Sequence, residues 1–391
     1  MTQPARRNYA QSHATVRISA KRFAASPWLP AYQTDDTVMG VYSRRFYPLT
    51  IGEDPIERYG KLRSGAVLFD VPEHPIEISG PDAVALLERV FCRRIARLKQ
   101  GRATYAIACN NDGGILMDGV LMRFEENRFW YVMADGEFLP WLQAQAAGFD
   151  ATIRDPRSWV LQIQGPKSFD VLADLVDGRA PEPFGYFAVS EVTIAGQPFI
   201  ISRTGWTGEL GFELYTLNPE IDGPAIFAHI LEKGQRHGLV FSSLESMGIR
   251  RIEAGILDNG TDIDPSMTPF AAGLGKFIDL DKEGDFCGKA ALEKALRDVL
   301  LTGLTCAGAT PVAGDRVYAG NAVAGRITAG AWSPHLETGV AYLRLDAPLG
   351  ADAGPLVLES SDGSRHEAAI VALPFYDPEK KIPRGLALAG S

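Results

Sequence analysis

The sequence lacks the features that mark several large classes of protein. It has only four cysteines in 391 residues, and none of them forms a CxxC pair or has a histidine at the spacing of zinc ligands. No apolar run approaches the ~20 residues that cross a membrane. Acidic residues (48) outnumber basic residues (39), which argues against a surface that neutralises nucleic-acid phosphates. We therefore expect a cytoplasmic protein that has no metal site and binds neither membranes nor nucleic acids.

Side chains with redox or metal chemistry are also few and scattered. The six histidines show no metal-ligand spacing, and no GxGxxG run follows an expected strand, so the sequence indicates no flavin or nicotinamide site. We expect the cysteines to be buried and reduced; the alternative is a lone catalytic thiol, which requires a histidine nearby in the fold. The cysteines concerned are Cys92, Cys109, Cys287 and Cys306.

What the sequence does contain is an alternation of expected strands and helices. Its length suggests two or three domains. Residues 1–34 carry five basic residues and no acidic one. We interpret residues 1–55 as an N-terminal arm and extension, the first part of which is loose and solvated.

The body of the chain, residues 56–298, repeats one local pattern. A strand, a Gly-Pro turn and a helix follow one another near residues 76–91 and again near 159–176. This repetition predicts two related subdomains, about 56–150 and 151–298, and the alternative is a chance similarity of two common turns.

Residues 299–391 have a different pattern, with short apolar segments between Gly, Pro and Asp. Turn signals recur every 8–12 residues or so, which is typical of a small β barrel or sandwich. We therefore predict the α+β fold class, with a multi-domain body and a C-terminal β barrel.

The segment "SRTGWTGELGFELY", residues 202–215, combines a tight turn with a half-buried strand. Its three glycines and three hydroxyl residues favour the turn, and "GFELY" alternates apolar and polar residues. Trp206 and Glu213 stand at the two ends, where they could clamp a flat ligand.

Several stretches of the chain, in this order and spacing, resemble the folate-dependent aminomethyltransferase family, whose best-known member is the T-protein of the glycine cleavage system. The resemblance runs from about residue 60 to the C-terminus and implies a central folate cavity and tetrahydrofolate as cofactor. It rests on "AVLFDVPEHPIEISGPDAVALLERV", "ATYAIACNNDGGILMDGVLM", "SRTGWTGELGFELY", "RRIEAGILDNGTDID" with "PFAAGLGKFIDLDKEGDFCGKAAL", and "AGRITAGAWSPHLETGVAYL".

Within that family the chain resembles the demethylase branch, typified by dimethylsulfoniopropionate demethylase. Trp206 stands where the family usually has Tyr, and Met117 replaces the first acid of the usual pair after Gly-Gly. The runs "RIEAG" and "GLGKF" also favour this branch.

The resemblance implies a catalytic role for Asp118, which aligns with the second acid of the family's pair. It would position the pterin and manage the N5 proton as the methyl group arrives. Strand alternation puts Leu116 and Asp118 on one face and Met117 on the other. The alternative is an Asp that caps the turn before its strand.

Four further residues align with the family's folate site. Glu213 would bind the 2-amino and N3–H edge of the pterin, Trp206 would stack on a ring or face a methyl-onium donor, and Tyr105 would line the cavity. The alternative for Glu213 is a solvent-facing strand residue. The alternatives for the other two are an aromatic residue of the core for Trp206 and an ordinary strand residue for Tyr105. Met247 takes the place of an expected Arg, for which Arg251 or its neighbour Arg250 could substitute.

The resemblance thus implies an enzyme that moves a methyl group from a small sulfonium, N-methyl or O-methyl donor to N5 of tetrahydrofolate. One alternative is an aminomethyltransferase that acts on a lipoyl carrier protein; the missing acid, the missing Arg and Asn259 in place of a family Tyr argue against it and against that partner. Another is a folate-binding factor of iron–sulfur assembly that has no turnover, although "DFCGKAAL" lacks most of that factor's motif.

Overall fold

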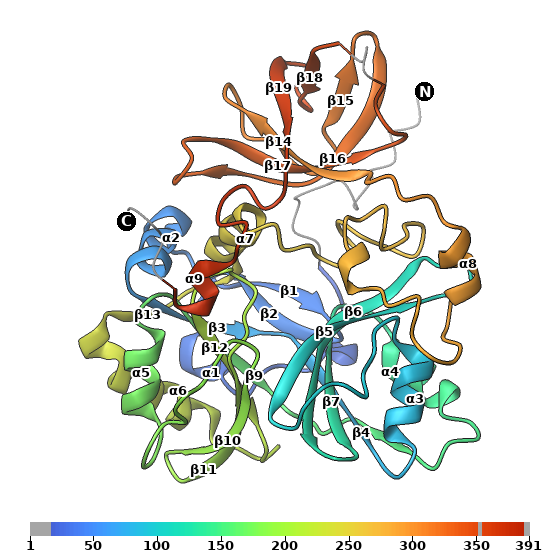
Figure 1. The fold of residues 1–391 in the computed structure, drawn as a ribbon. Coiled ribbons are helices and arrows are strands. Elements are labelled where there is room, and N and C mark those ends of the chain that lie inside the picture. The colour runs from blue at the N-terminus through green and yellow to red at the C-terminus, as the bar shows by residue number, and fades with distance from the viewer. Residues whose placement is uncertain (1–16, 351–353, 387–391) are drawn as a thin grey trace.

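The structure is a computed structural model that describes residues 17–350 and 354–386 of the chain. Its strands form two large sheets, a two-stranded hairpin and a closed barrel. Figure 1 shows the two sheets side by side in the lower half of the molecule, with the barrel above them. This architecture confirms the predicted α+β body with a C-terminal barrel. No helix within the described residues is long and apolar enough to span a membrane.

The six-stranded sheet has the order β10-β11-β12-β9-β3-β13 and is antiparallel except for the pair β3 and β13. Helices α5 and α6 cover its outer face, where apolar side chains of strands and helices form one core cluster. The bounds are β3 (Ala66–Val71), β9 (Val160–Gln164), β10 (Val189–Ile194), β11 (Gln197–Ser202), β12 (Gly211–Thr216), β13 (Leu239–Phe241), α5 (Ser168–Leu175) and α6 (Gly223–Gly234).

The five-stranded sheet is antiparallel throughout, with the order β5-β6-β7-β4-β8. Helices α3 and α4 cover its outer face through a second core cluster. The bounds are β4 (His74–Ser79), β5 (Arg102–Cys109), β6 (Ile115–Glu125), β7 (Arg128–Met133), β8 (Thr152–Arg154), α3 (Ala83–Val90) and α4 (Phe138–Gln145).

The two Gly-Pro turns noted in the sequence have the same backbone geometry. Gly80 has φ 125° and Gly165 has φ 123°, values that L side chains rarely adopt. A Cβ atom would lie 2.6 Å from a backbone oxygen at Gly80 and 2.5 Å from one at Gly165, so glycine is required at both. One strand crosses the boundary between the predicted subdomains. By its position in the sequence β3 falls in the first subdomain, but it pairs with β9 and β13 and so belongs to the six-stranded sheet.

The inner faces of the two sheets pack against each other. Side chains such as Phe69 and Ile200 of one sheet share a core with Trp130 and Val132 of the other, and Met247 of α7 closes this core. Helices α2 (Pro55–Ser64) and α7 (Leu244–Glu253) pack together between the sheets and the barrel. The body thus has four layers, with the two sheets in the middle and helices on the outer face of each. There is room for a cavity between the sheets.

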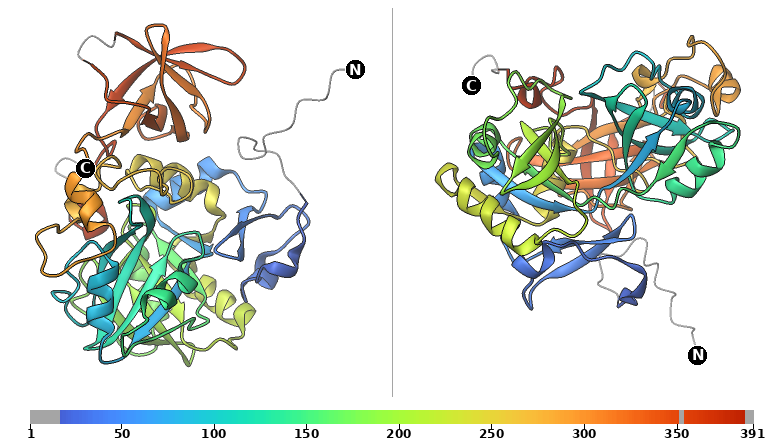
Figure 2. Two further views of the ribbon diagram at one scale, coloured as in Figure 1. Left: turned by 90° about the vertical axis from the view of Figure 1, so that its right-hand side faces the viewer. Right: turned by 90° about the horizontal axis from the view of Figure 1, so that it is seen from below.

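The expectation of a loose arm is wrong for the described part of the N-terminal region. Trp28 is 0% exposed in the core of the six-stranded sheet, and Tyr32 donates a 2.7 Å hydrogen bond to the buried Asp70. Apolar burial and a buried carboxylate that needs donors hold this segment to the body; residues 1–16 lie outside the described residues. Figure 2 shows the segment along one side of the body. It contains η2 (Ala20–Arg22), α1 (Leu29–Tyr32), β1 (Val38–Tyr42) and β2 (Arg45–Thr50).

The barrel closes in the order β14-β17-β16-β15-β18-β19 and packs on α7. Beyond β19 the chain returns to the body, where Figure 1 shows α9 lying beside α7. We call residues 374–385 the return segment. The bounds are β14 (Leu301–Cys306), β15 (Arg316–Ala319), β16 (Ala322–Ser333), β17 (Thr338–Leu345), β18 (Leu356–Glu359), β19 (Arg365–Val371), α9 (Lys381–Arg384), α8 (Lys289–Lys294), η3 (Gln235–His237) and η4 (Gly275–Phe277).

Candidate active site

A cavity of about 1140 Å³ lies between the two sheets. Its walls come from both sheets, from α7, from the β1–β2 hairpin and from the return segment. Ligand pockets of ~300–1,000 Å³ are usual, so this one has room for a cofactor and a small second substrate together. All five predicted site residues line it: Tyr105, Asp118, Trp206, Glu213 and Arg251.

The carboxylate of Asp118 is held by two donors from different parts of the chain. The Tyr105 hydroxyl donates to one oxygen at 2.7 Å, and the Asn259 amide donates to the other at 2.9 Å. Asp118 is only 7% exposed, and burial raises its pKa although both hydrogen bonds oppose the shift. A fixed carboxylate of raised pKa facing a cavity can accept a proton from a bound group.

The predicted facing of Leu116 is wrong, because a β-bulge interrupts β6. Ala108 pairs with Met117, but Cys109 pairs with Ile115, so Leu116 has no partner on β5. Leu116 and Met117 therefore both pack in the core on the helix side of the sheet, while Asp118 faces the cavity.

Glu213 is a buried acceptor surrounded by donors. The hydroxyls of Thr204 and Tyr215 donate to one carboxylate oxygen at 2.6 and 2.5 Å, and Ser202 lies 3.2 Å from the same oxygen. Gln162 donates to the other oxygen at 3.1 Å. Burial raises the pKa of Glu213, and the hydroxyl donors oppose that shift. The alternative of a solvent-facing strand Glu is excluded, since the residue is 4% exposed.

We predict that Glu213→Gln weakens tetrahydrofolate binding about 10- to 100-fold, the worth of one charge-assisted hydrogen bond pair. Gln keeps the shape of the side chain and removes its charge, so the fold should persist. Titration calorimetry measures the affinity, and Glu191→Gln, an exposed position on the outer strand of the same sheet, is the matched control. Equal affinity of Glu213→Gln and the parent protein would remove Glu213 from the folate site.

Trp206 and Arg251 lie against each other. The Arg251 guanidinium carbon is 5.1 Å from the centre of the Trp206 ring, so one face of the indole already has a cation on it. The guanidinium also forms a buried ion pair with Asp262 and donates to the Ile256 carbonyl at 3.3 Å. Arg251 therefore orients Trp206, and less of its hydrogen-bonding capacity remains for a ligand than the sequence suggested.

Several lining residues were not identified from the sequence. Gln162 donates to Glu73 at 2.9 Å as well as to Glu213, which brings a second carboxylate to this wall. Burial, and next the charge of Glu213, raise the pKa of Glu73. Tyr42 and Tyr47 of the hairpin also line the cavity. No local pattern marks these residues, because each reaches the site from a separate element.

Comparison with known proteins gives two family matches. The description "GCVT N-terminal domain" matches residues 41–282, and "Glycine cleavage T-protein C-terminal barrel domain" matches residues 300–377. A solved structure of the glycine cleavage system aminomethyltransferase T from Bartonella henselae superposes with a TM-score of 0.80 at 26% identity, covering 90% of this chain and 98% of that one.

Two relatives with different names are similar in sequence. An aminomethyltransferase of Streptomyces coelicolor is 37% identical over 346 residues, which are 85% of this chain and 92% of that protein. A trimethylamine-oxide aldolase of Ruegeria pomeroyi is 32% identical over 348 residues, which are 84% of this chain but 44% of that protein.

Proposed function

This chain belongs to the GCVT family of tetrahydrofolate-dependent one-carbon transferases, and we propose that it moves a one-carbon unit from a small cationic amine or onium donor to N5 of tetrahydrofolate. The observation that carries the proposal is the charge of the cavity wall around Asp118. Neither Asp118 nor Asp258 has an ion-pair partner within 4.0 Å among the residues that the structure describes. Carboxylates without an ion-pair partner at the wall of a cavity favour a bound cation.

Aromatic rings accompany these carboxylates. Tyr42 and Tyr47 lie edge to face with their centres 6.5 Å apart, and both line the cavity. Burial raises the pKa of Tyr42, and the charges of Asp258 and Asp118 raise it further. Both carboxylates line the same cavity as the ring. Faces of aromatic rings next to carboxylates are the usual surroundings of quaternary ammonium and similar cations.

The residues of the wall fit the cofactor of the family. When bound, tetrahydrofolate supplies N5 as the acceptor of the one-carbon unit. Glu213 would accept the hydrogens of the pterin edge, and Asp118, oriented by Tyr105 and Asn259, would accept the proton that N5 loses. An onium donor leaves as a neutral amine or sulfide and needs no acid from the protein.

Two forms of this reaction remain as candidates, each with its own support. The name of the Streptomyces relative favours transfer from an aminomethyl group, as on a lipoyl carrier. Trp206, Met117 and Met247, and the N-methyl compound in the name of the Ruegeria relative, favour transfer from a free methylated donor.

We expect the purified protein to convert tetrahydrofolate in the presence of one donor class, measured by mass detection of the folate products. The panel holds sulfonium, N-methyl and O-methyl compounds and an aminomethylated lipoyl protein. 5-Methyltetrahydrofolate from a free cationic donor selects the methyl reaction. Ammonia release that depends on the lipoyl protein selects the aminomethyl reaction. Turnover with neutral O-methyl donors alone would contradict the proposed cation site, and folate binding without any product would favour the assembly factor.

A further inference from the structure

Asp262 is a fully buried carboxylate that joins three parts of the molecule. It lies in the loop of residues 256–263, which follows α7, and it is 0% exposed. One of its oxygens accepts from Arg251 of α7 and, at 2.9 Å, from the backbone N–H of Asp258. The other oxygen accepts from the hydroxyl of Thr328, a residue of the barrel strand β16, at 2.6 Å. Both oxygens are thus occupied, by donors from a helix, from the loop itself and from the barrel.

A β-bulge in β16 turns Thr328 toward this carboxylate. Ile327 pairs with Leu343 and Ala329 pairs with Tyr342, so Thr328 has no partner on β17. Ile327 packs inside the barrel, whereas Ala329 packs in the core between the barrel and the body. In a regular strand these two side chains would point to the same face. The extra residue therefore reverses the facing of the strand and directs the Thr328 hydroxyl at the body, as bulges beside functional sites often do.

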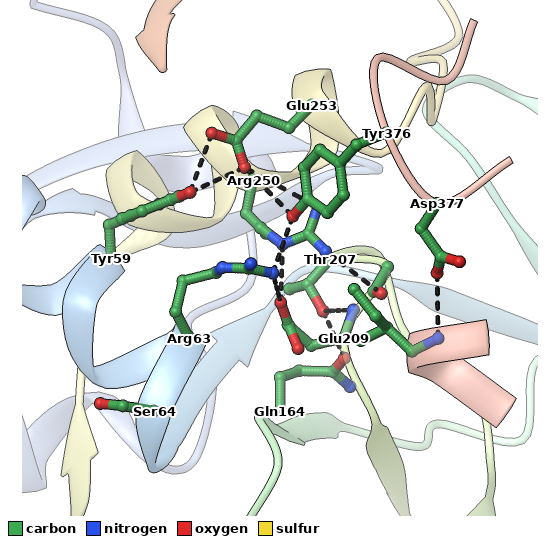
Figure 3. Close-up of polar contacts among 12 residues, drawn as sticks. Tyr59, Arg63, Ser64, Gln164, Thr207, Glu209, Arg250, Glu253, Tyr376 and Asp377 are labelled. Carbon is green, nitrogen blue, oxygen red and sulfur yellow. Dashed lines mark hydrogen bonds and ion pairs between the residues drawn. The ribbon is translucent and has the colours of Figure 1, made fainter. Parts of the chain in front are cut away.

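The helix from which the loop starts is also fixed by the barrel. The Tyr342 hydroxyl of β17 donates to the Ile256 carbonyl at 2.9 Å, just beyond the end of α7. Ser333 of β16 donates to Glu253, in the last turn of α7, at 2.5 Å. Figure 3 shows that the return segment reaches the same carboxylate, where the Tyr376 hydroxyl lies 3.5 Å away. The loop therefore leaves α7 from a point that buried polar contacts hold in place.

The loop carries the side chain that holds the proposed proton acceptor. Asp262 closes a tight turn, since its backbone N–H donates to the carbonyl four residues earlier at 2.8 Å. Asn259, inside that turn, donates to the Asp118 carboxylate at 2.9 Å. On the other side of Asp262, the guanidinium carbon of Arg251 is 5.1 Å from the centre of the Trp206 ring. A displacement of Asp262 would therefore move the groups that orient both Asp118 and Trp206.

We propose that Asp262 and Thr328 are positioning residues, through which the C-terminal barrel holds Asn259, and with it the carboxylate of Asp118, in the orientation that the reaction needs. The inference rests on the role of Asp118 in the proposed function. Among the described residues that line the cavity, none belongs to the barrel strands β14 to β19. The barrel thus acts on the reaction through the loop after α7.

Loss of the Thr328 hydroxyl should change the titration of Asp118. The hydrogen bond from Asn259 lowers the pKa of Asp118 against the effect of burial. A loop that is held less firmly weakens this bond, so the midpoint of the titration should move to higher pH. The barrel variants leave unchanged the other titratable groups whose pKa the charge of Asp118 affects, namely Tyr42, Tyr105, Tyr131 and Asp258.

The test follows the Asp118 carboxyl by carbon-13 NMR in the full chain without folate or donor, and the resonance is assigned by its absence in Asp118→Asn. Asn259→Leu, which removes the hydrogen bond itself, should raise the midpoint by about one pH unit. Thr328→Val keeps the shape of the side chain and should raise the midpoint by a smaller amount, and Thr328→Ser should restore the parent value. Thr302→Val removes a barrel hydroxyl that donates to the Val371 carbonyl at 3.2 Å; it is the matched control and should leave the midpoint unchanged.

Turnover gives a second readout, at a pH where Asp118 is ionised in every variant. Thr328→Val should lower kcat about 2- to 30-fold, the usual range for a residue that acts through others. Folate affinity by titration calorimetry should change less than kcat, because the contacts of Glu213 are untouched. Thr328→Ser should recover the lost turnover, and Thr302→Val should lose none.

An unmoved midpoint in either Asn259→Leu or Thr328→Val would overturn the inference, whatever the melting temperature of the variant. Equal shifts in Thr328→Val and Thr302→Val would overturn it too, since they would reflect a general loosening of the barrel. The NMR measurement needs no turnover. A parent protein that converts no donor, in variants of which the midpoints move as expected, would contradict the proposed function and support the positioning role of the barrel.

Discussion

Asp118→Asn should lower turnover about 10²- to 10⁴-fold, the usual contribution of one positioned proton acceptor. The amide keeps the shape of the side chain and can still bond to Tyr105 and Asn259, but it cannot take a proton. Folate affinity should change less than about tenfold, because at most one hydrogen bond is altered. Fixed-time assays measure the effect on turnover, and titration calorimetry measures the effect on folate affinity.

The pH profile of the same variant distinguishes a proton acceptor from a structural residue. Burial raises the pKa of Asp118, so the parent protein should lose turnover on the acid side at a pH above the usual range of aspartate. The ionised form is the active one, which means that the rate falls as pH falls through the raised pKa, and that this limb vanishes in Asp118→Asn. Asp112→Asn, on the exposed turn before β6, is the control. Unchanged turnover in Asp118→Asn would take Asp118 out of the mechanism.

Arg250→Met should lower the free energy of unfolding by about 3–5 kcal/mol, the cost of breaking a buried ion pair from one side. Arg250 is 1% exposed; its Nε donates to Glu209 at 2.8 Å and its Nη1 lies 3.8 Å from Glu253 (Figure 3). Without the guanidinium both carboxylates stay buried, with Arg63 left for Glu209 and neutral hydroxyls for Glu253. Urea unfolding followed by circular dichroism measures the loss.

A control variant and a double variant test whether the loss of stability comes from the buried ion pair. Arg236→Met breaks an exposed pair with Asp174 and should cost less than about 1 kcal/mol. Adding Glu253→Gln to Arg250→Met removes the carboxylate that is left without a cation, so part of the lost stability should return. If Arg250→Met is no more harmful than Arg236→Met, the network of Figure 3 does not hold the return segment.

Local patterns in the sequence predict much of the fold for clear reasons. The two Gly-Pro turns require φ values that favour glycine, and closely spaced turn signals mark the strands of the barrel. The pattern failed where packing overrode it. The alternation in "GFELY" was compatible with a solvent-facing Glu213, but strand β12 is buried on both faces, so Glu213 is buried as well. Trp28 lies in a stretch without acidic residues that predicted solvation, but it fills a core.

The candidate site was likewise predictable only in part from the sequence. Resemblance along the chain selected five residues that do meet in one cavity, because family motifs keep the strands and turns that carry them. The partners of those residues come from elsewhere. Asn259 holds Asp118 from 141 residues away, and Gln162 joins Glu73 to Glu213. Such contacts depend on the packing of whole elements and leave no local signal.

By itself, the sequence determined the class of the fold, the C-terminal barrel, the family and five residues that line one cavity. Only the tertiary structure decided which charges are free to bind. The sequence does not distinguish the two arginines of α7 from Lys276 and Lys380. Folding pairs Arg250 and Arg251 with Glu209 and Asp262, whereas neither lysine has an ion-pair partner among the described residues. The reason is that ion pairing and burial act through space over a few ångströms, whereas a sequence pattern records only order along the chain.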